Sequence, residues 1–299
     1  MKNSRAGIFA LAAALLAAGS VHAQESRWRP FASITPVYQG KGDLDQGGDY
    51  SVWRAAARAG VTGQLSPGVG GGVTLRYEYA NYSFSSPAAF GGVAPWSIVQ
   101  EYGVAIPLSF GLTDGWSIGV VPSVDWFREN GADTGDSLVW GGIVSAVRRF
   151  DNGSRLGLGV GAFDQIEKNE VFVFPIVDWR LAERWRVINP LAAGPTGPAG
   201  LELDYLVDED WTIGVGAARR RDRFRLSETG PVPNGVGEER GVPVFLRATR
   251  RLGKEMSLHL YAGVIADGRL RVEDRSGNLV REDDFDPAPF VGATLLGRF

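Results

Sequence analysis

The sequence predicts an all-β fold: a closed antiparallel transmembrane β-barrel of about 14 strands, with about 12 as the alternative. Three observations support this prediction. Segments of the chain alternate apolar and polar residues, as strands with two different faces do. The connections between these segments are of two kinds, tight turns and long polar loops. The nine tryptophans fall near the ends of the predicted strands.

The first 23 residues are predicted to be a cleaved signal peptide. Lys2 and Arg5 form a basic start, an apolar stretch runs from residue 6 to about residue 18, and cleavage is expected after Ala23. The apolar stretch is too short for a membrane anchor. The chain is therefore expected to be exported, with residues 24–299 forming one barrel domain.

Composition excludes several classes of protein. The chain contains no cysteine, so disulfides do not stabilise it. Beyond the signal, no apolar run reaches the roughly 18 to 20 residues that a membrane helix requires. A formal net charge of −3 argues against nucleic acid as a partner. Glycine, at 41 of 299 residues, and the frequent aromatic residues favour β structure.

The predicted strands alternate with a period of two. Between Val73 and Tyr79 every odd position is apolar and every even position is polar. Each strand then has one apolar face and one small or polar face, which in a membrane barrel face lipid and lumen. The strands are expected at 27–39, 51–65, 69–82, 96–111, 116–127, 137–150, 155–166, 170–181, 185–192, 199–207, 211–226, 239–252, 256–272 and 287–299.

Two kinds of connection separate these strands. Tight-turn sequences such as Ser66-Pro67-Gly68 and Thr113-Asp114-Gly115 contain residues that tolerate a left-handed backbone. The other connections are mostly longer and polar, at 40–50, 83–95, 128–136, 227–238 and 273–285. Short turns at one end and long loops at the other are typical of transmembrane barrels.

The tryptophans sort into two levels. A soluble β-sandwich would bury tryptophan at mid-strand, whereas a membrane barrel carries it in two aromatic girdles at the lipid headgroups. The distribution therefore favours the membrane barrel. Trp28, Trp116, Trp179, Trp185 and Trp211 lie near the short-turn ends of strands, and Trp53, Trp96, Trp126 and Trp140 lie near the long-loop ends.

Prolines inside the predicted strands oppose this interpretation. A proline lacks the N–H that a ladder needs, and a closed barrel has no free edge to hold one. Two prolines recur in matching segments, Pro122–Trp126 and Pro175–Trp179, each with an inward aspartate. We interpret these segments as one structural device used twice, with chance recurrence as the alternative. The prolines concerned are Pro30, Pro36, Pro107, Pro122, Pro175, Pro243 and Pro289.

The chain ends on a strand closed by an aromatic residue. From Phe290 the apolar positions alternate until the chain stops at Phe299. In this strand and in its mature length the chain resembles Gram-negative outer-membrane β-barrel proteins, porin-like barrels of unknown function. The resemblance implies location in the bacterial outer membrane and recognition of the strand ending at Phe299 by the barrel-assembly machinery. Gly297 departs from the large apolar residue that is usual two places before the end.

Patterns for catalysis and metal binding are weak. Beyond the signal the only histidine is His259, and Tyr261 occupies the place where a barrel hydrolase would carry its serine. A hydrolase that pairs Asp267 with His259 is the alternative. No zinc-type cluster is present in the sequence, and the acidic residues at 43–49 and 282–286 lack a recognisable calcium spacing. We therefore expect neither an enzyme nor a cofactor.

Charges on the polar faces of the strands are expected to line the lumen. Charge on the lipid face costs roughly 2–4 kcal/mol near the midplane. Rings of charge would set the selectivity of a water-filled channel; paired across the lumen, the same charges would plug a structural barrel. The predicted lumen-lining residues are Arg54, Arg58, Arg76, Glu78, Glu101, Asp125, Asp178, Arg180, Arg247, His259 and Asp267.

An arginine-rich segment, Arg219–Arg225, follows the eleventh predicted crossing and is expected at the long-loop rim. A basic mouth for anionic solutes and a merely solubilising rim are the alternatives to lipid contact there. Guanidinium groups are well shaped for phosphate. The residues that share the parity of the apolar face, and that we expect to contact lipopolysaccharide, are Arg219, Arg221, Arg223 and Arg225.

The expected function is a passive channel for small hydrophilic solutes, with selectivity set by the lumen charges. A structural or adhesive barrel with a plugged lumen is the alternative, and an outer-membrane hydrolase is a third. The expected partners are outer-membrane lipid, lipopolysaccharide and the barrel-assembly machinery, with no nucleic acid.

Overall fold

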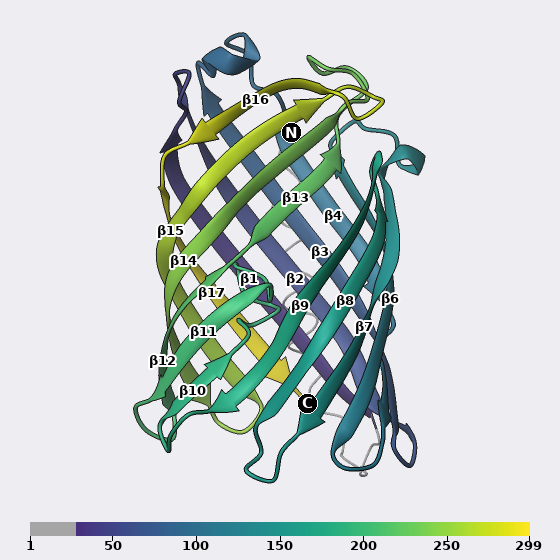
Figure 1. Cartoon of the computed structure of the whole chain (residues 1–299). Coiled ribbons are helices and arrows are strands. Elements are labelled where there is room, and N and C mark those ends of the chain that lie inside the picture. Colours follow the sequence, from purple (N-terminus) through teal and green to yellow (C-terminus); the bar gives the residue numbers. More distant parts are fainter. Residues whose placement is uncertain (1–27) are drawn as a thin grey trace.

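The computed structural model describes residues 28–299, so the predicted signal peptide lies outside the described residues. These residues form one sheet that closes on itself as a barrel (Figure 1). No helix among residues 28–299 is long and apolar enough to cross a membrane. The elements are β1 (Trp28–Asp43), β2 (Asp49–Ser66), β3 (Val69–Ser85), η1 (Ala88–Phe90), β4 (Ile98–Ala105), β5 (Leu108–Gly111), β6 (Trp116–Glu129), η2 (Gly135–Ser137), β7 (Leu138–Arg149), β8 (Arg155–Gln165), β9 (Lys168–Arg180), β10 (Trp185–Ile188), β11 (Gly200–Leu206), β12 (Trp211–Ala218), β13 (Arg220–Arg225), β14 (Val236–Leu252), β15 (Met256–Glu273), β16 (Leu279–Phe285) and β17 (Ala288–Arg298).

The barrel has 14 strands. Three of them are interrupted: β4 and β5 both pair with β3 and β6, β12 and β13 both pair with β14, and β16 and β17 both pair with β15. β1 pairs with β2 on one side and with β17 on the other, which closes the cylinder. The ladders are antiparallel apart from a single bridge between β13 and β6. The predicted count of 14 is confirmed, and the alternative of 12 is wrong.

The two ends of the barrel differ as the turn and loop sequences predict. Short turns join the strands at the lower end in Figure 1, where β1 begins at Trp28 and β17 ends at Arg298. Longer loops, which contain η1 and η2, project from the upper end. In outer-membrane barrels the short turns are periplasmic and the long loops extracellular. We therefore call the lower end periplasmic and the upper end extracellular.

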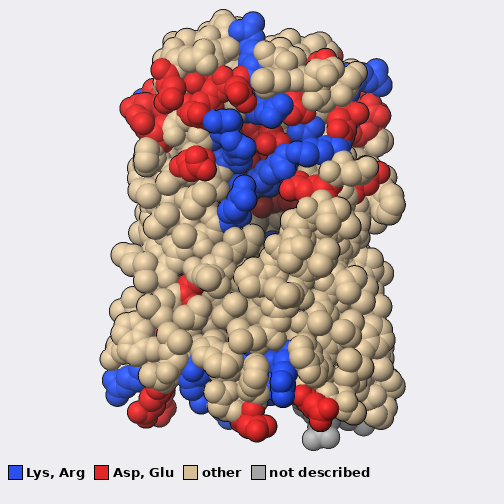
Figure 2. All heavy atoms as spheres, viewed as in Figure 1, with Lys and Arg blue, Asp and Glu red and all other residues tan. Residues whose placement is uncertain are grey.

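The outer wall carries an apolar band. Alternate side chains point outward and are exposed, for example 61% of Leu158 and 71% of Val171. On the face seen in Figure 2, charged side chains gather toward the two ends, with few between them. Monomeric soluble proteins rarely expose contiguous apolar patches larger than a few hundred Å². The band is therefore the surface that faces hydrocarbon.

Eight of the nine tryptophans occupy the outward positions that the girdles require. Trp116 and Trp211, for example, are exposed where β6 and β12 begin at the periplasmic end, and Trp53 and Trp140 are exposed near the extracellular end. Trp96 is the exception, because it is 2% exposed and lies inside the barrel. The expected girdle position of Trp96 is wrong, since the loop that precedes β4 turns inward.

Four of the seven prolines in question lie where the ladder on one side of a strand is interrupted. Pro107 falls between β4 and β5, and Pro122 on β6 faces that gap, where its carbonyl accepts from Ile106. Pro243 on β14 faces the gap between β12 and β13. Pro175 lies on β9 opposite the stretch that β10 does not reach. No backbone N–H is required at these four places, so these four prolines are compatible with a closed barrel.

A lysine on the apolar band should destabilise the barrel. Leu246 is exposed on the outward face of β14 near mid-strand, so Leu246→Lys should lower the free energy of unfolding by roughly 2–4 kcal/mol. Thr62→Lys, on the lumen face of β2, is the matched control and should cost much less. Urea unfolding in phospholipid vesicles, followed by tryptophan fluorescence, measures both variants. Equal losses would contradict the outward assignment of Leu246.

Candidate functional site

An apolar core closes the extracellular end of the lumen. Trp96 lies within it, and its ring packs edge-on against Tyr82 at 5.7 Å and Phe224 at 5.2 Å between ring centroids. Because inward side chains of β2, β3, β13, β15 and β16 converge on this ring, the core crosses the lumen. We call this core the plug; its buried residues are Leu44, Tyr50, Val52, Ala80, Tyr82, Phe90, Trp96, Val99, Phe224, Leu226, Leu270, Val272, Phe285 and Ala288.

A buried polar layer adjoins the plug. Arg54 forms an ion pair with Glu239. The hydroxyls of Tyr50 and Tyr82 donate to the same carboxylate at 3.2 and 2.6 Å. All four side chains are buried, so their partners are protein groups rather than bulk water. Arg54 faces the lumen as predicted, but it belongs to the closure of the barrel rather than to an open pore wall.

Residues 189–199 fold into the lumen instead of extending the wall. β10 ends at Ile188 and β11 begins at Gly200, so both strands are shorter than the predicted 185–192 and 199–207. Thr35 on β1 donates a hydrogen bond to the carbonyl of Ala193 at 2.6 Å. The segment therefore reaches across to the wall formed by β1 and β17. We call residues 189–199 the inward loop.

A cavity of about 260 Å³ lies between the inward loop and the charged walls of β2, β3 and β4. Five of the predicted lumen residues line it together: Arg54, Arg58, Arg76, Glu78 and Glu101. The start of β13 closes another side with Arg220, Arg221 and Asp222, and Arg219 precedes them. We call this cavity the chamber.

Ion pairs organise the walls of the chamber. Arg76 donates to both carboxylate oxygens of Asp125, at 2.5 and 2.6 Å. Arg220 donates to Glu78 at 2.8 Å, although 142 residues separate the two in sequence. Bidentate and charge-assisted bonds of this kind hold both side chains in one orientation. Arg76, Glu78 and Asp125 thus lie on the lumen side, where parity places them, as paired groups around a small space.

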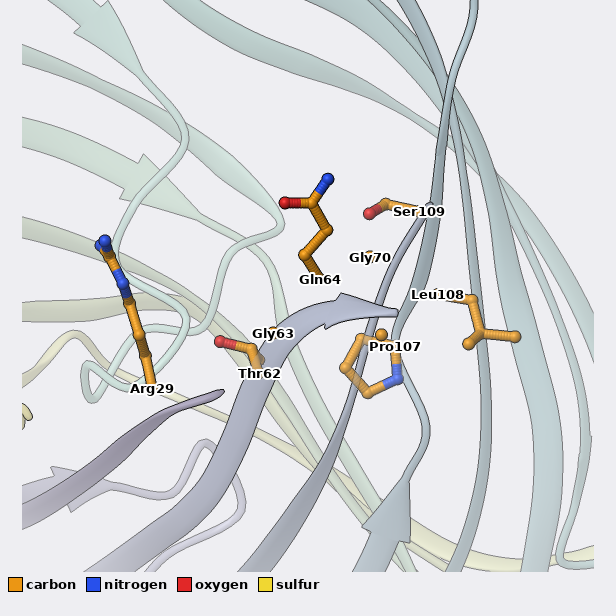
Figure 3. A pocket seen from close by; sticks show the side chains of 9 residues that line it. Arg29, Thr62, Gly63, Gln64, Gly70, Pro107, Leu108 and Ser109 are labelled. Atoms are coloured by element: carbon orange, nitrogen blue, oxygen red, sulfur yellow. The ribbon is translucent and has the colours of Figure 1, made fainter. Parts of the chain in front are cut away.

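A second cavity, of about 490 Å³, lies nearer the periplasmic end (Figure 3). Figure 3 shows Arg29, Gln64 and Ser109 projecting into one space. Successive inward positions of β2 connect the two cavities, because Arg58 lines the chamber, Thr62 lines the second cavity and Gly60 lies between them. The Phe31 ring lies against Gly60, where it would meet an added Cβ. Phe31 therefore lies beside the stretch of β2 that separates the two cavities.

Between β9 and β13 the barrel wall lacks part of its backbone hydrogen bonding. β10 pairs with β9 only at Asp178–Arg180, and toward the extracellular end no ladder partner of this edge occurs within residues 28–299. Asn189 continues the contact for one step, accepting from the Val177 N–H at 2.8 Å and donating to the Pro175 carbonyl at 3.1 Å. Figure 2 shows this face hollowed, with charged side chains in the hollow. We call this part of the wall the seam.

Arginines of β13 hold the extracellular part of the seam. Their side chains reach β9 and the β8–β9 turn, so ion pairs take the place of the missing ladder. We call these contacts the clasp. They join Arg221 to Glu170 at 3.0 Å, Arg223 to the carbonyl of Ile166 at 2.7 Å and Arg225 to Glu167 at 2.6 Å.

The clasp corrects the expected position of two arginines. Arg223 and Arg225 are 5% and 3% exposed, because the β8–β9 turn lies over the outward face of β13. An exposed position on the lipid-facing rim is therefore wrong for both. Arg219 is exposed and Arg221 partly so, and their contact with lipopolysaccharide stays a prediction.

His259 belongs to a hydrogen-bonded group on the lumen faces of β14 and β15. Its Nε2 lies 2.8 Å from the Ser257 hydroxyl and its Nδ1 lies 2.9 Å from the Thr249 hydroxyl. Arg247 lies 3.4 Å from Nδ1 and is itself paired with two carboxylates of β11. The sequence pattern expects a serine two residues after the histidine, so it missed Ser257, which lies two residues before it. A general base is oriented by a carboxylate behind the ring, whereas a hydroxyl and a cation face this Nδ1.

Asp178 lies on the lumen face at the periplasmic end of β9. It is bonded to Arg155 at 2.6 Å and to Arg186 at 2.5 Å. Asp125 in the other proline segment is likewise held by an arginine, so the two segments share an arrangement as well as a sequence. Arg180, two residues further along β9, is exposed.

Asp267 does not line either cavity. It is exposed, with a φ of 48°, at a bulge where the register of β14 and β15 shifts. The extra residue reverses the parity of β15, so Leu270 and Val272 turn inward to the plug. The predicted lumen position of Asp267, and its pairing with His259, depended on a regular strand and are wrong.

No protein-family profile matches the sequence, and no curated protein matches it. Among solved structures, an outer-membrane channel from Pseudomonas putida F1 is 10% identical, with a TM-score of 0.49 over 94% of this chain and 98% of that chain. The toluene transporter TodX from Pseudomonas putida is 9% identical, with a TM-score of 0.44 over 91% and 89%. The translocator domain of the autotransporter NalP from Neisseria meningitidis is 12% identical, with a TM-score of 0.38 over 97% and 95%. These likenesses describe architecture, and function is argued from the residues of the barrel.

Removing an arginine of the clasp should destabilise the barrel. Arg223→Ala removes the buried ion pairs with Glu238 at 3.2 Å and Glu273 at 2.5 Å. Arg221 and Arg271 still pair with these carboxylates, so the cost should be about 1–3 kcal/mol. Arg275→Ala removes an exposed ion pair and should cost about 0–1 kcal/mol. Urea unfolding compares the two variants. Similar, small losses would mean that the clasp does not hold the seam.

Proposed function

We propose that the protein is a passive channel for small hydrophilic solutes in the outer membrane. The observation that supports this best is the chamber, a cavity of about 260 Å³ lined by charged side chains. Charges removed from water cost several kcal/mol each unless they are well paired. A barrel with only a structural role would be more stable with an apolar filling in this place. Water and a passing solute account for a polar cavity.

The proposed channel is narrow and closed along its axis in this conformation. The plug and the inward loop both cross the lumen, so a solute passes along the axis only when both of them move, or leaves through the side when the seam opens. The seam is the least supported part of the wall, because side chains rather than a ladder close it. Segments with few backbone hydrogen bonds open at low free energy. We therefore place movement at the inward loop and the seam.

A structural barrel is the second candidate, and the plug favours it. Phe224 and Trp96 are almost completely buried and pack like residues of a protein core. Such packing stabilises a closed extracellular end and leaves a surface of loops for adhesion. The two candidates differ in one measurable property, the passage of ions.

The proposed partners are outer-membrane lipid and lipopolysaccharide around the apolar band. Phe299 is partly exposed at the periplasmic end of β17, where the barrel-assembly machinery would bind it. Of the four arginines predicted to meet lipopolysaccharide phosphates, Arg219 is the most exposed; it lies beside the seam and also lines the chamber.

Planar-bilayer recordings test the channel. The wild-type protein should give small conductance steps in potassium chloride. The double variant Trp96→Ala and Phe224→Ala should give larger steps, because it removes two rings from the plug and leaves a cavity. Trp140→Ala, which changes an exposed girdle residue, is the control and should behave as wild type. If neither the wild type nor the plug variant conducts, the channel is excluded and the structural barrel remains.

A further inference from the structure

We propose that the chamber is a binding site for a small organic anion that carries a carboxylate, held by the guanidinium groups of Arg58 and Arg219. The transport role of such a site rests on the proposed channel function, since it names the class of solute that the lumen would select. Three features of the chamber support it: its carboxylates are paired with arginines, two of its arginines have no acidic partner in the described part of the chain, and the cavity is small.

The carboxylates that line the chamber are already committed to arginines. Glu78 and Asp222 each lie 2.8 Å from Arg220. Glu101 lies 3.7 Å from the Nε of Arg76. These acids neutralise cations within the wall. A cationic solute would therefore have to displace an existing partner before it could bind.

Two of the chamber arginines, Arg58 and Arg219, are not paired in this way among the described residues. No hydrogen bond or ion pair of the Arg58 or Arg219 side chain occurs within residues 28–299, although both line the chamber. Each guanidinium carries five N–H donors in a planar fork that matches a carboxylate. Arg58 is partly buried, and a partly buried cation without an acceptor is costly, whereas Arg219 is exposed. An anion in the chamber would supply the missing acceptor oxygens.

The position and size of the chamber limit the ligand. Arg58 lies on the lumen face of β2, whereas Arg219 lies between β12 and β13 beside the seam. The cavity of about 260 Å³ is smaller than the roughly 300–1,000 Å³ of sites for drug-sized molecules. The remaining walls include Ala56, Gly194 and Gly197, which leave room without adding charge. A compact carboxylate fits this lining better than an oligomer does.

Isothermal titration of succinate into the folded, detergent-solubilised full chain tests the site, in a buffer free of other carboxylates and phosphate. The wild type should bind succinate saturably and should not bind the neutral analogue succinamide. Arg58→Gln and Arg219→Gln should each weaken binding by about tenfold or more, because each removes charge-assisted hydrogen bonds. Arg148→Gln, which lies outside the chamber and packs over Phe150, is the matched control and should bind as wild type.

Arg58→Lys keeps the charge without the planar fork, so its affinity for succinate should lie between those of the wild type and Arg58→Gln. This variant also tests the site if Arg58→Gln folds poorly. Heat-modifiable migration on a denaturing gel verifies that each variant forms a barrel. Absent binding to the wild type, or unchanged affinity in the folded double variant of Arg58→Gln and Arg219→Gln, overturns the site. Succinate binding without conductance would remove the channel and keep the site. Conductance without succinate binding would remove the site and keep the channel.

Discussion

The structure depends on one constraint: within hydrocarbon, backbone N–H and C=O groups need partners from the chain itself. Closure of β1 on β17 meets this requirement for most of the wall, and it leaves no edge along those two strands. The period-two alternation follows, because each strand must offer lipid an apolar face. The girdles follow as well, since indole rings such as those of Trp116 and Trp140 prefer the headgroup level on either side of that band.

The seam is the place where this constraint is met by other means. Pro190, Pro195 and Pro198 prevent the inward loop from continuing β10 and β11 as full-length strands. The loop instead enters the lumen, and the edge of β9 that faces β10 has no ladder partner among the described residues on the extracellular side of Asp178. Asn189 and the clasp supply side-chain bonds in compensation. One departure from regular strand structure thus produces the inward loop, the chamber it bounds and the seam beside it.

Local patterns in the sequence predicted the cylinder well. Alternation, turn chemistry and tryptophan placement are short-range properties, so the 14 strands could be counted from them. The plug, the inward loop and the clasp depend on contacts between distant segments, such as Arg220 with Glu78 across 142 residues, which no periodicity reports. Parity failed for Asp267 because one extra residue in β15 reverses it. Parity placed Arg223 and Arg225 on the outward face correctly, but it could not show that the β8–β9 turn covers them.

Lumen charge proves to be a set of local pairs, with Arg76 bound to Asp125 and Arg247 bound to Glu202. Bound in this way, most of these groups stabilise the wall and do not form free rings. What distinguishes the barrel from a wide pore is therefore its filled interior: a lipid-facing cylinder with a dry extracellular core. The fluorescence of single-tryptophan variants that retain only Trp96 or only Trp140 tests this claim most directly, with brominated lipid and aqueous iodide as quenchers. The account predicts that brominated lipid quenches Trp140 strongly and that neither quencher reaches Trp96. Strong quenching of Trp96 by iodide, or a Trp140 that brominated lipid leaves unquenched, would contradict it.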